Sequence, residues 1–237
     1  MDSQPGESIG GTRAAFEAVL RRALLLDLEV SHRGAILKLG AVLGNQQLAR
    51  SGNASWEGIL RELNRLAEGA DCVLGHNLVE HDLPFLQERA SSLSLLRLPV
   101  VDTLVLSPLC FPENPYHRLV KDYKLVKESL NDPVADARQA AALFADELQS
   151  LSGLRQTEPR LFEVLHFLLA TPDQEADPLS KGMALVFRTL GATPPARDRA
   201  LDLCRELVPE WGCASAPTDE SLMLTKAGRL ALAYTLA

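Results

Sequence analysis

The segment that most constrains the fold is ALLLDLEV, residues 23–30, a nearly continuous apolar run that two acidic residues interrupt. A short apolar run between polar residues is typical of a strand that is buried on both faces of a sheet. The segment GAILKLGAVLG, residues 34–44, follows after the turn SHRG, as an antiparallel hairpin partner would. Residues 45–52 suggest a third strand. The sequence therefore predicts a sheet built on this hairpin.

Strand and helix patterns alternate from the hairpin up to about residue 150, and a helix is also expected before it, over residues 12–22. The further segments expected are a helix at 56–68, a strand at 71–77, a helix from residue 81, a strand at 98–106 and a helix from 132 to about 150. The polar residues 152–160 suggest a linker, and only helical patterns follow. We expect an α/β domain over residues 1–154 and a small α-helical domain over residues 155–237.

The charge balance narrows the classes of function. The chain has 24 Lys and Arg against 31 Asp and Glu, a net charge of −7. This balance argues against a protein that coats nucleic acid non-specifically, because phosphate neutralisation needs basic side chains. It is compatible with an enzyme that gathers carboxylates around metal ions. No apolar run approaches the roughly 18 residues that cross a bilayer, and the N-terminus does not resemble a signal peptide, so we expect a cytoplasmic protein without a membrane partner.

Four acidic residues stand out by their positions. Asp27 and Glu29 lie two residues apart in the first strand, so their side chains point to the same face. Two carboxylates on a buried strand need a cation, whereas on an edge strand both would simply be exposed. Asp82 follows a strand end, where α/β proteins form their sites, and Asp136 lies one turn inside a helix. Taken singly, each of these acids is better explained as a solvated surface residue.

The segments LLLDLEV, VLGHNLVEHDLPFL, VVDTLVLS and LNDPVADARQAAALF, in this order and spacing, resemble the DnaQ-like (DEDD) 3′–5′ exonucleases of the ribonuclease H-like superfamily. The resemblance covers about residues 20–150. It implies a ribonuclease H-like mixed sheet flanked by helices, and two Mg²⁺ or Mn²⁺ ions held by Asp27, Glu29, Asp82 and Asp136. Hard oxygen ligands suit such ions, and two of them can promote phosphodiester hydrolysis from the 3′ end of DNA or RNA single strands.

The sequence departs from this family at Asn131, where the His-type branch carries its catalytic histidine. Asparagine can orient a water molecule but cannot take its proton at neutral pH. The Tyr-type branch would need a tyrosine at Asp132. Two hypotheses follow. The domain is either a weakened exonuclease, helped by His117 or His81, or a decayed nuclease fold that binds nucleic acid or another protein.

A basic stripe between the predicted accessory strand and the last acidic segment is a candidate nucleic-acid contact. Its residues recur every three positions and are Arg118, Lys121, Lys124 and Lys127. They would contact phosphates, or would be a solvated helix face. Asn77, at the end of a predicted strand, is a further candidate. Residues 122–141 also resemble a subgroup whose exonuclease domain precedes a RecQ-like helicase, so a helicase in this or another chain is an expected partner. This chain itself has no GxxxxGK[ST] motif.

Overall fold

The computed structural model describes residues 6–31, 34–52, 55–114, 132–171, 177–211 and 225–237. These residues contain a five-stranded mixed sheet in the order β3-β2-β1-β4-β5. The strands are β1 (Ala23–Val30), β2 (Ile36–Leu43), β3 (Gln46–Ser51), β4 (Cys72–Gly75) and β5 (Val100–Asp102). Strands β1, β2 and β3 are antiparallel neighbours, and β4 and β5 run parallel to β1. The predicted hairpin and third strand are confirmed.

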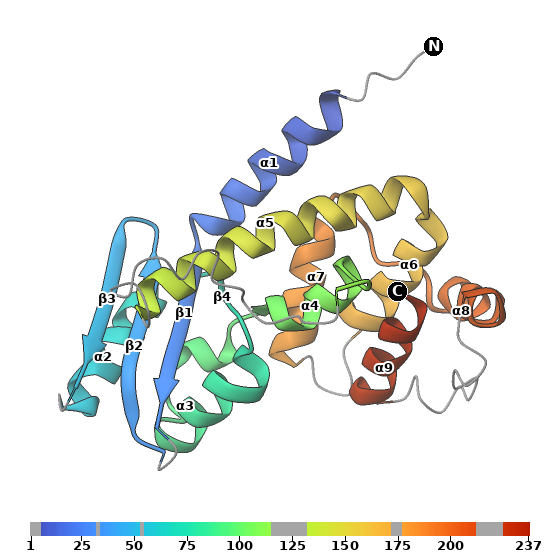
Figure 1. The fold of residues 1–237 in the computed structure, drawn as a ribbon. Helices are drawn as coiled ribbons and strands as arrows, with labels where there is room; N and C mark the ends of the chain where they lie inside the picture. Colours follow the sequence, from blue (N-terminus) through green and yellow to red (C-terminus); the bar gives the residue numbers. More distant parts are fainter. Residues whose placement is uncertain (1–5, 32–33, 53–54, 115–131, 172–176, 212–224) are drawn as a thin grey trace.

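Helices cover both faces of the sheet (Figure 1). The helices of the first part are α1 (Gly6–Leu20), α2 (Trp56–Ala67), the π-helical turn η1 (Leu78–Asp82), α3 (Leu83–Arg89), the 3₁₀ turn η2 (Ser94–Arg97) and α4 (Thr103–Cys110). Those that follow are α5 (Pro133–Thr157), α6 (Pro159–Ala170), α7 (Pro178–Thr189), α8 (Arg197–Trp211) and α9 (Lys226–Leu236). Helix α5 crosses one face of the sheet and α2 covers the other, while α6 to α9 gather beside the sheet.

The side chains of β1 alternate between two buried clusters. Leu24, Leu26 and Leu28 belong to the cluster that the sheet forms with α2 and α3. Leu25 belongs to the other cluster, which includes residues of α4 to α9. Because successive side chains of a strand point to opposite faces, Asp27 and Glu29 point to the face that α5 covers. The prediction that these two acids share a face is confirmed.

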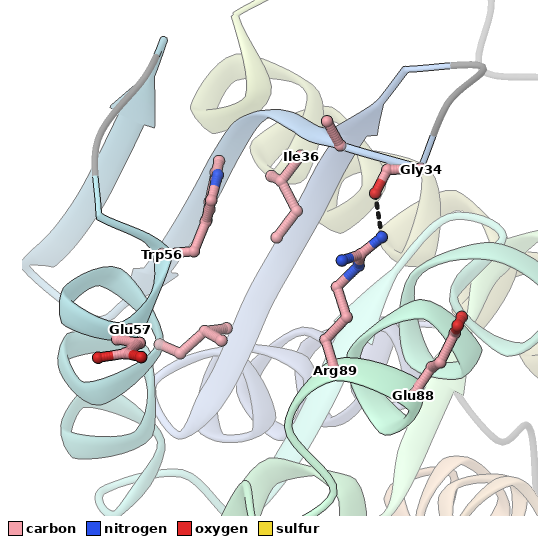
Figure 2. A pocket seen from close by; sticks show the side chains of 8 residues that line it. Gly34, Ile36, Trp56, Glu57, Glu88 and Arg89 are labelled. Carbon is pink, nitrogen blue, oxygen red and sulfur yellow. Dashed lines mark hydrogen bonds between the residues drawn. The ribbon is translucent and has the colours of Figure 1, made fainter.

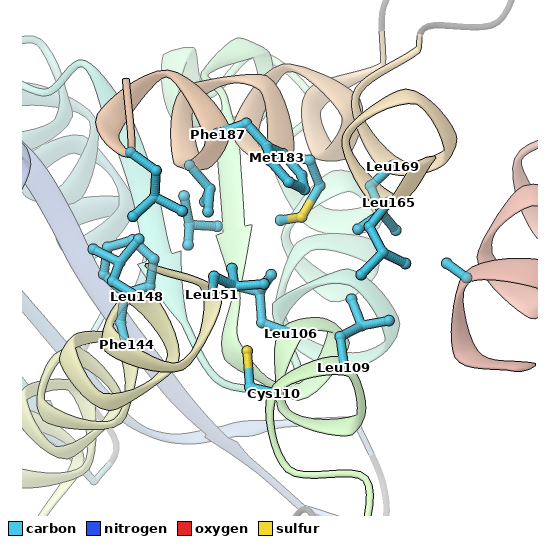
Figure 3. Close-up of a cluster of buried hydrophobic side chains, with 14 of the residues drawn as sticks. Leu106, Leu109, Cys110, Phe144, Leu148, Leu151, Leu165, Leu169, Met183 and Phe187 are labelled. Atoms are coloured by element: carbon cyan, nitrogen blue, oxygen red, sulfur yellow. The ribbon is translucent and has the colours of Figure 1, made fainter. Parts of the chain in front are cut away.

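Two glycines allow helices to lie directly on strands. A Cβ atom at Gly40 of β2 would lie 2.3 Å from the carbonyl carbon of Pro133, at the start of α5. A Cβ atom at Gly182 of α7 would lie 1.7 Å from the carbonyl oxygen of Val100 in β5. Side chains of α4, α5, α6 and α7 then meet in one apolar cluster beside the sheet (Figure 3). Any larger residue at either glycine would push a helix away from the sheet.

Two secondary-structure predictions are wrong. The strand expected over residues 98–106 ends at Asp102, and α4 begins at Thr103, because the Asp102 side chain accepts a hydrogen bond from the backbone N–H of Leu104 and so caps the helix. The linker expected over residues 152–160 is helical, since α5 continues to Thr157 and α6 begins at Pro159. Helix α5 thus crosses the predicted domain boundary, and one buried cluster contains side chains from both sides of it.

Among the helices that the structure describes, none combines the length and the apolar character needed to span a bilayer.

Candidate functional site

Asp27 and Glu29 lie on a strand that is central in the sheet order, not at its edge as the alternative interpretation had it, although they lie beyond the part of β1 that pairs with β4. β1 has β2 on one side and β4 on the other. Across β2, Asp27 pairs with Gly40 and Glu29 pairs with Lys38. The parallel pairing with β4 ends at Leu25, so the last part of β1 extends beyond its neighbour. Both acids are half-buried at this projecting end of the strand.

Asp82 is bound to β1 between these two acids. It is 3% exposed and is the last residue of the π-helical turn η1. Its Oδ1 accepts a hydrogen bond of 2.8 Å from the backbone N–H of Leu28, the residue between Asp27 and Glu29. Beyond the last paired residue of β4, the Asp82 carboxylate thus supplies the acceptor that a neighbouring strand would otherwise provide. A residue 54 positions away is therefore held beside the two acids of β1.

The turn between β4 and Asp82 is tight and specifically shaped. A Cβ atom at Gly75 would lie 2.5 Å from the carbonyl oxygen of Leu26, so the end of β4 approaches β1 closely. Asn77 has φ 66°, in the left-handed region, and its carbonyl accepts a hydrogen bond from the N–H of His81. Asparagine tolerates this conformation better than most residues. The predicted contact of Asn77 with nucleic acid stays a prediction.

Asp102 holds this turn in place, a role that was not predicted from the sequence. It is 1% exposed at the end of β5. Its Oδ1 accepts from the N–H groups of Asn77 and Leu104 at 2.8 and 3.0 Å, and its Oδ2 accepts from the N–H of Val79 at 2.9 Å. Burial raises its pKa, although these backbone donors lower it. An acidic residue between an apolar strand and a helix start was the signal available in the sequence.

His81 is the neighbour of Asp82 and faces its second oxygen. The distance from His81 Nδ1 to Asp82 Oδ2 is 3.5 Å. The hydrogen bond to Asp82 raises the pKa of His81, and the charge of Asp27 contributes in the same direction. Burial raises the pKa of Asp82, whereas His81 and the Leu28 amide lower it. His81 and the carboxylates of Asp82 and Asp27 therefore interact electrostatically.

Asp136 lies in the first turn of α5, as predicted, and is half-buried. The helix begins at Pro133, where Asp132 caps it by accepting a hydrogen bond of 3.0 Å from the N–H of Val134. This first turn lies on Gly40, the cross-strand neighbour of Asp27. The fold thus brings the helix turn that carries Asp136 to the same part of the sheet as Asp27. Six predicted residues lie outside the described residues: His117, Asn131, Arg118, Lys121, Lys124 and Lys127.

The four acids fit a divalent cation by their chemistry, since carboxylate oxygens are the ligands that Mg²⁺ and Mn²⁺ prefer. Their elements also converge on the end of β1. Within the ranges that the structure describes, however, no three His, Cys, Asp or Glu side chains form a group that could hold a metal ion. Basic side chains lie next to two of the acids: Lys38 next to Glu29, and His81 next to Asp82.

A cavity of about 690 Å³ lies on the opposite side of the sheet, between the hairpin, α2 and α3 (Figure 2). Trp56 and Ile36 lie on one side of it and Arg89 on the other. The Arg89 guanidinium donates to the carbonyl oxygen of Gly34 and stacks 4.4 Å from the ring centre of Phe85. None of the four acids lines this cavity.

The sequence matches no family model, and no curated protein is significantly similar to it.

Proposed function

We propose that this protein is a metal-dependent 3′–5′ exonuclease that hydrolyses phosphodiester bonds of DNA or RNA single strands. The observation that carries the proposal is the hydrogen bond from the Leu28 amide to Asp82, which places a third carboxylate beside Asp27 and Glu29. Asp82 satisfies the Leu28 amide and so also has a structural role, but it adds a third negative charge near two others at the end of β1. Carboxylates gathered in this way need a cation.

The fold supports the same proposal. A mixed sheet flanked by helices is what the resemblance to the ribonuclease H-like superfamily implies, and the described chain has such a sheet. The first acids lie on its central strand, and the helix with the fourth acid packs directly on that region. The four acidic residues that the resemblance selects therefore all lie on elements that meet near the end of β1.

Asp27, Glu29, Asp82 and Asp136 would hold the metal ions. When bound, two such ions supply Lewis-acid stabilisation of the attacking and leaving oxygens of a phosphodiester. The chain's own residues do the rest. The Leu28 amide and Asp102 hold Asp82 and its turn in position, Asn131 orients the attacking water, and the basic stripe at residues 118–127 contacts phosphates. A helicase in this or another chain remains the expected partner.

The test is degradation of 3′-labelled single-stranded DNA and RNA in the presence of Mn²⁺. Asp27→Ala and Asp136→Ala should abolish shortening of the strand, because each removes a proposed metal ligand. Asp198→Ala is the matched control, because Asp198 is an exposed acid of α8. Activity that survives both ligand substitutions would contradict the assignment of the site.

A specific observation favours a second candidate, a decayed nuclease fold that binds strand ends. Lys38 already forms an ion pair with Glu29, and Asn131 provides no general base. This candidate predicts binding to single-stranded 3′ ends without metal-dependent degradation at high protein concentration. Degradation that Asp82→Ala abolishes would exclude it.

The substitution Asn131→His separates a weakened enzyme from a decayed one. General bases contribute about 10²–10⁴-fold to rates, so a restored base should increase degradation visibly at neutral pH. An increase shows that metal and strand already bind productively and that proton removal limits the reaction. If wild type and variant are both inactive, the defect lies in metal or strand binding.

A further inference from the structure

Lys38 is the basic residue that lies against the proposed metal ligands on the strand next to them. It is the cross-strand partner of Glu29, and its Nζ lies 3.3 Å from Glu29 Oε2. The two side chains are 27% and 25% exposed. This ion pair is therefore neither buried nor freely solvated, and it forms on the face of the sheet that carries Asp27.

The surroundings of Lys38 direct its side chain to the acids. Two residues further along β2, on the same face, stands Gly40, which has no side chain and lies under the start of α5. Gly40 is the cross-strand partner of Asp27, so the space on β2 beside Asp27 is filled by the helix backbone. Lys38 is thus the side chain that β2 contributes at this end of the site, where β1 presents Glu29.

An ammonium group and a divalent cation compete for the same carboxylate. Lysine carries a compact charge on a flexible stem, so its ammonium group can bind Glu29 and can also swing away. A metal ion on Glu29 would meet the positive charge of Lys38 at a few ångströms, where like charges repel each other. The lysine must therefore leave Glu29 before or as the ion binds.

We propose that Lys38 is a built-in competitor of the divalent cation, which holds Glu29 in an ion pair and thereby lowers the affinity of the site for metal. This inference rests on the proposed function, because it assumes that Glu29 is a metal ligand. It makes Lys38 a positioning residue that acts through Glu29.

The experiment is a titration of the metal-free full chain with Mn²⁺. Calorimetry and the electron paramagnetic resonance signal of the free ion both measure the affinity for Mn²⁺. Lys38→Met should bind Mn²⁺ roughly tenfold more tightly than wild type, because an ion pair of this exposure contributes modestly. Lys38→Arg, which keeps the charge, should stay near wild type. Lys181→Met is the matched control, since it removes an exposed lysine of α7 and changes the net charge equally.

The possible results separate this inference from the proposed function. Equal Mn²⁺ affinity of wild type and Lys38→Met overturns the role of Lys38 and leaves the exonuclease proposal standing. Absence of binding in every variant overturns both. If Lys181→Met binds Mn²⁺ as tightly as Lys38→Met does, the gain in affinity reflects net charge, and the proposed role of Lys38 is overturned. Lys38→Gln, which keeps a polar side chain, repeats the measurement if the thermal unfolding of Lys38→Met shows a damaged fold.

Discussion

Two buried carboxylates of this protein have opposite surroundings. Asp102, at the end of β5, accepts hydrogen bonds from three backbone N–H groups of the turn and helix next to it. Glu147, in the middle of α5, accepts one hydrogen bond of 2.7 Å from the hydroxyl of Ser107, and its Oε2 has no hydrogen-bond partner among the described residues. Both side chains are almost completely buried.

The difference shows what each region needs from a carboxylate. Near the proposed site, the backbone of a tight turn presents amide groups that a side-chain acceptor must satisfy, and this fixes the turn that ends in Asp82. In the core between α4 and α5, burial raises the pKa of Glu147 to about 9, so at neutral pH it is mainly the uncharged acid. One carboxyl group shapes the backbone, while the other is a neutral polar group in an apolar cluster.

The largest effect is expected for Asp102→Ala. Three part-buried N–H groups would lose their acceptor at once. An unsatisfied buried group costs about 1–3 kcal/mol, and partial access to water keeps the sum low, so we expect a loss of about 3–5 kcal/mol in the free energy of unfolding. Urea unfolding measures this loss. Amide hydrogen exchange should also accelerate at Asn77, Val79 and Leu28, because the turn that positions Asp82 is released. Unchanged exchange at Leu28 would show that Asp82 is held independently of Asp102.

The next effect is a pH dependence that Glu147→Gln should remove. In the unfolded chain the Glu147 carboxyl group loses its proton near its ordinary pKa of 4.5. In the folded protein it keeps this proton up to a pH of about 9, because its pKa is raised to about 9. The contribution of Glu147 to stability is therefore fully present below pH 4.5 and is lost as the pH rises to about 9.

Between pH 6 and 8, the free energy of unfolding of wild type should consequently fall relative to Glu147→Gln by about 2–3 kcal/mol. Chemical denaturation of both proteins across this range measures the difference. A constant difference would show that Glu147 is charged in the folded protein.

A smaller loss is expected for Ser107→Ala, which removes the one hydroxyl that Glu147 contacts through Oε1. The buried acid would then lack this donor, at a cost of about 1–2 kcal/mol at neutral pH. Thermal unfolding of this variant and of the double variant Ser107→Ala, Glu147→Gln forms a mutant cycle. Strict additivity of the two changes would mean that the two side chains do not interact.

The smallest effect is expected for His81→Gln. His81 is close to the buried Asp82, but its own side chain is 46% exposed, so water screens the interaction. The free energy of unfolding should change by less than about 0.5 kcal/mol at pH 7. A loss as large as that of Asp102→Ala would mean that a solvent-exposed side chain holds the turn as strongly as the backbone hydrogen bonds of Asp102 do.

Local patterns in the sequence were sufficient for much of the fold. The apolar run and the turn after it predicted β1 and β2, and the pair Asp132 and Pro133 predicted where α5 begins. The spacing of two residues between Asp27 and Glu29 predicted that they share a face. These features depend on neighbours along the chain, which is why they could be read without a structure. The exonuclease activity and the metal ions stay proposals.

Other features depend on contacts that no local pattern encodes. The strand expected after Asp102 became α4, because a buried carboxylate caps a helix there. The polar residues 152–160 became helical, since α5 and α6 bury their apolar sides in the common cluster. In both cases tertiary packing outweighed the local composition.

The sequence by itself determined which segments become the main strands and helices and which acids lie on one face of β1, because periodicity and capping act over a few residues. Tertiary structure alone decided the composition of the site. It placed Asp82 on the amide of Leu28, 54 residues away, and Lys38 on Glu29 through the register of two strands. Such contacts follow from how strands and helices pack against each other, and each depends on the positions of elements that are distant in the chain.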